Sequence, residues 1–73
     1  MSHHVVAELV ANIGPIDVRV GSAVAADDSL MLLESMKMEI PVLAEVAGTV
    51  TAVRVVTGDV VREGDILVEI DPS

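Results

Sequence analysis

Lys37 is the only lysine in the 73-residue chain and supplies its one side-chain primary amine. It lies between Met36 and Met38, directly after Glu34 and Ser35. A primary amine can attack an activated acyl carbon and form an amide, and a single lysine offers one unambiguous site for that reaction. Most other reactive side chains are missing, since the chain has no Cys and no Tyr. The sequence therefore predicts that function centres on Lys37.

Length and composition restrict the kind of protein that can hold this amine. A chain of 73 residues is long enough for one domain, residues 1–73, and too short for an active-site cleft of ordinary enzyme size. Apolar residues make up 52% of the chain without a single aromatic ring, and fifteen of them are valines. Because β-branched side chains favour strands, we expect an all-β fold. Because the chain is too short for an ordinary active-site cleft, we expect that the protein is not itself an enzyme.

The charge of the chain bears on its partners and location. A formal net charge of -8 argues against nucleic acid and against anionic membranes, since both are repelled by an acidic surface. A protein partner with a basic docking face fits better. The chain has no cysteine, no signal-peptide pattern at its first residues and no apolar run of about 18 residues. We expect a cytoplasmic protein.

An internal repeat organises the sequence. Shifting the chain by 37 positions aligns residues 7–34 with residues 44–71 without a gap. Apolar positions, turn glycines and aspartates coincide in this alignment. The identical pairs are Ala7 and Ala44, Glu8 and Glu45, Val18 and Val55, Gly21 and Gly58, Val24 and Val61, Asp28 and Asp65, and Leu30 and Leu67. The repeat predicts two halves of similar structure.

Each half has the period-two alternation of strands, for example Ile16, Val18 and Val20. Gly21 and Gly58 suit turns, because glycine reaches positive φ without a Cβ penalty. Asp27 stands where the second half has the turn glycine Gly64, and we expect it to enter the left-handed region in its place. Ala11, Gly14 and Pro15 also differ from the second half, so the path of the second strand is left open.

A single half with about four short strands cannot bury its apolar face alone. The two halves should therefore pack as a sandwich or flattened barrel of two quasi-symmetric four-stranded antiparallel sheets. Residues 35–43 then form the hairpin between the halves, with Lys37 at the pole opposite both termini. Pro41 favours an edge position for this segment, because it cannot donate a ladder hydrogen bond.

The run from Glu34 to Glu39, with its Met, Lys, Met centre, resembles the attachment motif of biotinyl domains, the biotin carboxyl carrier family. The resemblance extends over nearly the whole chain, including the stretches 47–50, 58–61 and 64–67. It implies two quasi-symmetric four-stranded sheets with covalent biotin on Lys37, at a hairpin tip. It also implies that Met36 and Met38 are contact surfaces for partners, that Ser35 leaves the amine accessible, and that Glu34 helps a ligase to choose the protein.

The same resemblance implies the partners and the role. A biotin protein ligase would attach biotin to Lys37, after removing a proton from an amine whose ordinary pKa is near 10.4. The protein would then carry carboxybiotin between biotin carboxylase and carboxyltransferase sites, where a tether gives a high effective concentration. It would catalyse nothing itself, and we expect a monomer in isolation.

Two other functions stay open. A lipoyl carrier domain is disfavoured by Met36 and Met38, since lipoyl domains usually have Asp, Lys, Ala at the motif. An unmodified β-sandwich binding module would use Lys37 only as a contact residue, and two methionines two residues apart are more often core side chains.

Other polar residues have ordinary interpretations. His3 and His4 could form a metal site with Glu8, but histidines at a terminus are usually disordered. Asp27 and Asp28 are better read as a solvated turn than as a calcium site. We interpret three glutamates as outward charges that keep the sheet edges soluble: Glu45, Glu63 and Glu69.

Overall fold

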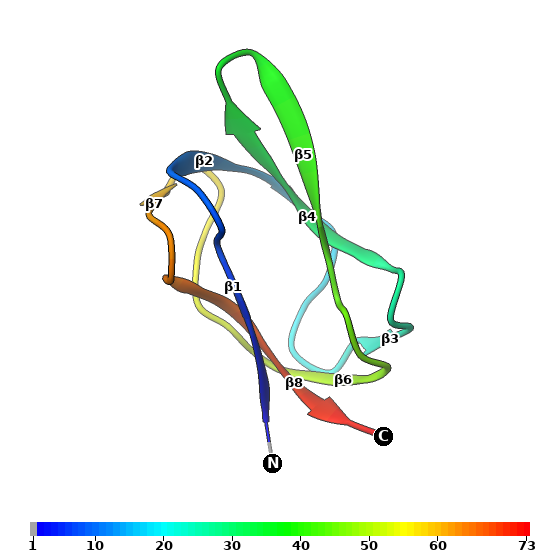
Figure 1. Cartoon of the computed structure of the whole chain (residues 1–73). Helices are drawn as coiled ribbons and strands as arrows, with labels where there is room; N and C mark the ends of the chain where they lie inside the picture. The colour runs from blue at the N-terminus through cyan, green and yellow to red at the C-terminus, as the bar shows by residue number, and fades with distance from the viewer. Residues whose placement is uncertain (1) are drawn as a thin grey trace.

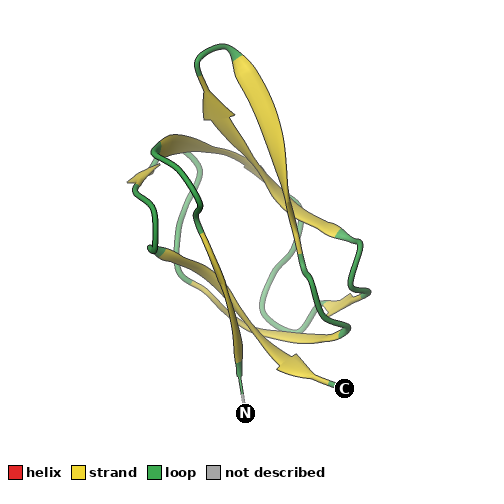
Figure 2. Cartoon of the chain, viewed as in Figure 1, coloured by secondary structure: helices red, strands yellow, loops and turns green. Residues whose placement is uncertain are grey.

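The computed structural model describes residues 2–73, which form eight strands and, within that range, no helix (Figures 1 and 2). The strands are β1 (His3–Val6), β2 (Ala11–Ile16), β3 (Ala23–Val24), β4 (Ser29–Ser35), β5 (Met38–Leu43), β6 (Gly48–Val53), β7 (Val60–Val61) and β8 (Ile66–Pro72). They build two four-stranded antiparallel sheets, in the orders β1-β8-β6-β3 and β5-β4-β2-β7. The expected all-β fold of two such sheets is confirmed. No helix in the described range could cross a membrane.

The strand bounds follow the repeat. Adding 37 to the limits of β2, β3 and β4 gives the limits of β6, β7 and β8. The same shift converts one sheet order into the other, with β5 in the place of β1. Each sheet therefore contains strands of both halves, because β1 and β3 join the sheet of β6 and β8.

Equivalent backbone hydrogen bonds connect the two halves. The Gly21 amide donates to the carbonyl of Val50, and the Gly58 amide donates to the carbonyl of Ile13, both over 2.8 Å. The φ values of Gly21 and Gly58 are 96° and 98°, which an L side chain would adopt only with strain. Two glycines thus permit the same crossing between sheets in both halves.

The core lies between the sheets and is entirely aliphatic apart from one methionine. The largest fully buried side chains come from both halves: Ile13, Leu30, Met31, Leu67, Ile70, Val50 and Val68. Within residues 2–73 no polar or charged residue is buried. Strands β4 and β8 share one burial pattern, since the second, third and fifth residues of each are buried.

The expectation for Asp27 is wrong, since its φ is not among the positive values of the described residues. The left-handed residue of this region is instead Glu45, with φ of 73°. The Glu45 amide donates to the carbonyl of Ala26 over 2.8 Å, so it contacts the turn that holds Asp27. In the second half Gly64 keeps a φ of 92°. The turn at Asp27 is therefore accompanied by a left-handed residue at Glu45, whereas the turn in the second half contains its own left-handed residue, Gly64.

The second strand follows the path of its counterpart. Both β2 and β6 have a register shift at equivalent places, between Ile13 and Ile16 and between Val50 and Ala52. Gly14 lies within this shift, where an added Cβ would come 3.0 Å from the carbonyl oxygen of Leu32. The glycine thus accommodates the close approach of β4.

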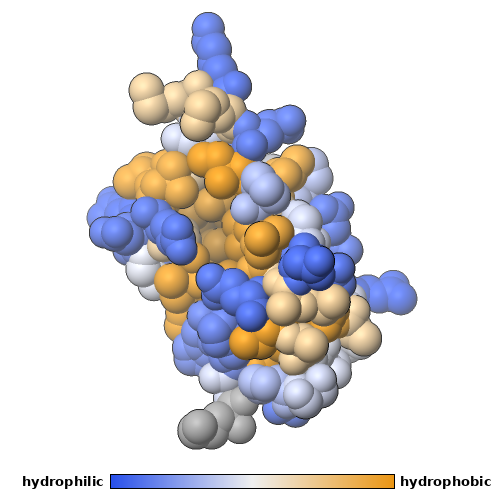
Figure 3. Space-filling model, turned by 45° about the vertical axis from the view of Figure 1, so that its right-hand side comes forward, coloured by the Kyte–Doolittle hydropathy of each residue, from blue (hydrophilic) through white to orange (hydrophobic). Residues whose placement is uncertain are grey.

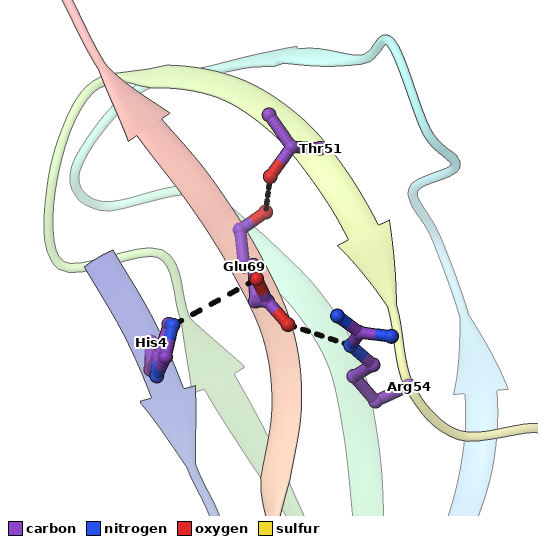
Figure 4. Close-up of polar contacts among 4 residues, drawn as sticks. All are labelled: His4, Thr51, Arg54 and Glu69. Carbon is purple, nitrogen blue, oxygen red and sulfur yellow. Dashed lines mark hydrogen bonds and ion pairs between the residues drawn. The ribbon is translucent and has the colours of Figure 1, made fainter. Parts of the chain in front are cut away.

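The histidines and Glu69 lie in ordered structure. His3 and His4 begin β1, which pairs with β8. Figure 4 shows Glu69 between Arg54 and His4: its Oε2 is 2.6 Å from Arg54 Nε, and its Oε1 is 3.7 Å from His4 Nε2. Because β8 is a central strand, the interpretation of Glu69 as an edge charge is wrong. Its carboxylate instead contacts side chains from two neighbouring chain segments.

The molecule is elongated, with extents of 35 × 18 × 17 Å. Figure 1 shows the β4–β5 hairpin at one end and both chain termini at the other. Lys37 lies in the turn of that hairpin, so it and the termini occupy opposite poles, as expected from the repeat.

Candidate functional site

The amine is displayed on a two-residue turn. Ser35 at the end of β4 pairs with Met38 at the start of β5, which leaves Met36 and Lys37 as the turn itself. Their φ values are 50° and 64°, so both central residues are left-handed, as in a type I′ turn. Asparagine and glycine usually fill such positions. The side chain of Lys37 is exposed to solvent.

The two methionines are surface residues. Met36 is 92% exposed and Met38 is 59% exposed, so neither fills the core. Flexible thioether side chains can adapt to differently shaped partners. Their exposure beside the amine gives the end of the hairpin an apolar, deformable surface. The alternative that the two methionines are core side chains therefore does not hold.

Glu34 and Glu39 lie directly opposite one another on the hairpin, one residue pair below the turn. Both are exposed, and like charges in this arrangement repel each other. Glu34 also covers Gly14, since an added Cβ there would be 3.3 Å from Glu34 Cγ. The pair of carboxylates marks the outer face of the hairpin. The sequence motif pointed to Glu34 as a site residue but not to Glu39. Their equal distance from the centre of the turn is the sequence feature that predicts the pairing.

The inner face of the hairpin has a different character. Side chains alternate along a strand, so Met38, Ile40 and Val42 share one face of β5. Ile40 and Val42 pack against the core, which identifies that face as the inner one. Ser35 pairs with Met38 and is half-buried there. The site thus combines an accessible amine, an apolar inner face and an acidic outer face.

The described residues offer no alternative chemical site. No group of three histidine, cysteine, aspartate or glutamate side chains within residues 2–73 could hold a metal ion. His3 does not meet Glu8; its Nε2 lies 3.0 Å from Oε1 of Glu45. Among the residues that the structure describes, the hairpin turn holds the single lysine and displays it to solvent.

Fold and site together define a small β-sandwich carrier domain that displays one lysine on a hairpin turn. Residues 4–70 match the family described as "Biotin-requiring enzyme". The chain therefore belongs to the biotin/lipoyl attachment family, as the resemblance of its motif indicated.

Individual relatives agree with this assignment. The chain is 51% identical to the biotinylated protein TB7.3 homolog of Mycobacterium leprae over 92% of this chain and 94% of that protein. It is 47% identical to the biotin carboxyl carrier protein of Streptococcus mutans, over 73% of this chain and 41% of that protein.

A solved structure shows the same architecture. A single-chain, multi-domain long-chain acyl-CoA carboxylase contains a region that superimposes with a TM-score of 0.92 and 28% identity. The match covers 99% of this chain and only 7% of that one. The protein is thus a biotin carrier domain, related to carboxyl carrier proteins and to the biotin domains of carboxylases, and its cofactor is covalently attached biotin.

Proposed function

We propose that Lys37 is the residue that receives biotin, and that a biotin protein ligase attaches it. The observation that carries this proposal is the position of Lys37 as the exposed second residue of the hairpin turn. No other lysine exists in the chain, so no other side-chain amine competes. The absence of bulky neighbours in the turn, apart from two flexible methionines, suits the entry of this amine into a ligase.

The reaction places specific demands on the side chain. The lone pair of Nζ attacks the acyl carbon of biotinyl adenylate, the new C–N amide bond forms, and the acyl–phosphate bond breaks to release AMP. The nitrogen must present a free lone pair, and the proton that it loses as the amide forms passes to the departing phosphate or to a base of the ligase. The carrier contributes presentation rather than catalysis.

Contacts around the amine would then select the ligase and later partners. We assign Met36 and Met38 to apolar contact, Ser35 to steric access and Glu34 to charge recognition. Bound biotin supplies a ureido ring that accepts and gives up a carboxyl group. The domain moves this ring between a biotin carboxylase and a carboxyltransferase without catalysing either step. In isolation the domain is a monomer.

A relocation of the single lysine tests the attachment site. The double variant Lys37→Arg with Arg62→Lys keeps one lysine and the same net charge but moves the amine to the turn before β8, without flanking methionines. After co-expression with a biotin protein ligase, intact mass should show biotin on the natural protein and none on this variant. Biotin on the variant, or an unmodified natural protein, would overturn the proposal. Arg62→Lys alone is the matched control and should carry a single biotin.

Partners and location need separate measurements. Capture of the biotinylated protein from native extract should recover biotin carboxylase and carboxyltransferase subunits, whereas the Lys37→Arg protein gives the background. Sedimentation of the purified protein tests whether it is monomeric. A cytoplasmic location stays a prediction, which fractionation of the native cell would test.

A further inference from the structure

An apolar groove separates the two edge strands β1 and β5. Its volume is about 270 Å³. Val6, Leu9, Ile40 and Leu43 line it with apolar side chains, and Glu8 and Glu45 contribute carboxylates. Figure 3 shows hydrophobic side chains gathered in a hollow on this side of the molecule. Val6 and Leu43 are 40% and 45% exposed, so the walls of the groove are open to solvent.

The groove arises from the symmetry of the fold. Val6 and Leu43 are 37 positions apart, as are Glu8 and Glu45, so part of the lining consists of equivalent residues from the two halves. Strands β1 and β5 each end a sheet, and neither pairs with the other. The groove therefore lies where two equivalent sheet edges face each other without closing.

One wall of this groove is the strand that follows Lys37. Met38 lies on the same face of β5 as Ile40, which lines the groove. An apolar track thus runs from the residue next to the amine into the groove. The other face of the hairpin holds the carboxylates of Glu34 and Glu39. An apolar group tethered to Lys37 meets a compatible surface only on the inner face.

We infer that the groove is a resting site for the biotin group carried by Lys37, an inference that rests on the proposed attachment at that residue. The lysine side chain and the acyl chain of biotin together provide about ten bonds between Cα and ring, which extend to about 13 Å. Residues in a strand advance about 3.3 Å each, so Ile40 and Pro41 lie about 10 to 13 Å along β5 from Lys37. The ring reaches the near end of the groove.

Size and chemistry fit this occupant. A volume of about 270 Å³ is small for a drug-sized ligand, whose pockets begin near 300 Å³, and suits a single bicyclic ring. The thioether ring and acyl chain of biotin are apolar and match the valine and leucine walls. The ureido N–H groups are donors, and Glu8 offers a carboxylate acceptor within the lining.

Comparison of the assigned NMR spectra of the unmodified and biotinylated proteins, residue by residue, tests the inference. Biotinylation should shift the amide signals of Val6, Leu9 and Ile40 and give nuclear Overhauser contacts between ring protons and the Val6 and Ile40 methyl groups. In Val6→Glu, which introduces charge into the wall, these shifts should fall at least two-fold. The matched control is Val60→Glu, an exposed valine on the edge strand β7, which should keep them. Ile40→Thr on the opposite wall repeats the test without depending on β1.

Each outcome has one meaning. Shifts confined to residues 34–39 in a protein whose mass shows biotin would overturn the resting site while leaving attachment at Lys37 intact. Groove shifts that grow with protein concentration would assign the groove to a second copy of the chain and would also overturn it. A protein without added biotin mass would instead be a failure of the proposed attachment.

Discussion

Met36 and Lys37 share a left-handed backbone conformation and together form the whole turn of the β4–β5 hairpin. Left-handed conformations cost a residue other than glycine roughly 1–2 kcal/mol. The fold accepts this cost at the two residues that display a thioether and an amine at the end of the hairpin.

Replacing Met36 by glycine should stabilise the protein. Met36 is 92% exposed and loses few contacts, whereas glycine adopts its φ of 50° freely. We expect the free energy of unfolding to rise by about 1 kcal/mol. Urea denaturation followed by far-ultraviolet circular dichroism measures it, because the chain has no aromatic residue for fluorescence. Met38→Gly, in a strand without positive φ, should lower stability; a loss in both variants would contradict the assigned strain.

Gly48 should not tolerate a side chain. An added Cβ would overlap the carbonyl oxygen of Asp71 and lie 2.9 Å from Cα of Pro72, both backbone atoms that cannot rotate away. We expect Gly48→Ala to lower the free energy of unfolding by about 1–3 kcal/mol. The equivalent residue of the first half is Ala11, which is 5% exposed and fits. Gly48→Ala should therefore cost more than Ala11→Gly in thermal melts, and the reverse order would disprove this packing.

Neutralising Glu69 should weaken the sheet of β1, β8 and β6. Its side chain is 16% exposed and contacts Arg54 and His4. Because Arg54 is 57% exposed and solvent screens the pair, we expect Glu69→Gln to lower stability by no more than about 1 kcal/mol. The loss should shrink in high salt. Glu63→Gln, which removes an exposed charge from the turn before β8, should change little; equal effects would show that net charge alone matters.

Pro41 should protect an open edge. It pairs with Leu32, three positions along β5 from the Ser35–Met38 pair that closes the turn. Hydrogen-bonded and non-hydrogen-bonded pairs alternate along an antiparallel ladder, so the Pro41 nitrogen faces away from β4, at the open side of an edge strand. Pro41→Thr restores an N–H donor there, and edge strands with free donors recruit other strands. Sedimentation velocity should detect more dimer than in the natural protein. Leu43→Thr, on the same edge without a new donor, should stay unchanged.

The sequence was sufficient for the architecture because Gly21, Gly58 and the alternating valines act locally, and each appears twice in one register. The resemblance of the motif identified Lys37 and its neighbours. The failures arose where a contact between distant segments decides the structure. The left-handed residue near Asp27 is Glu45, chosen by the packing of two turns. The groove between β1 and β5 depends on which edges face each other, and no local pattern records that.

The position of the termini has a consequence for movement. Both ends of the chain lie at the pole opposite Lys37, along a body whose longest dimension is 35 Å. If either end were held by a linker, the compact body would act as a rigid spacer between anchor and amine. The amine would then reach farther from the anchor than the linker alone allows, by nearly the length of the domain. This extra reach would need no additional flexible residues.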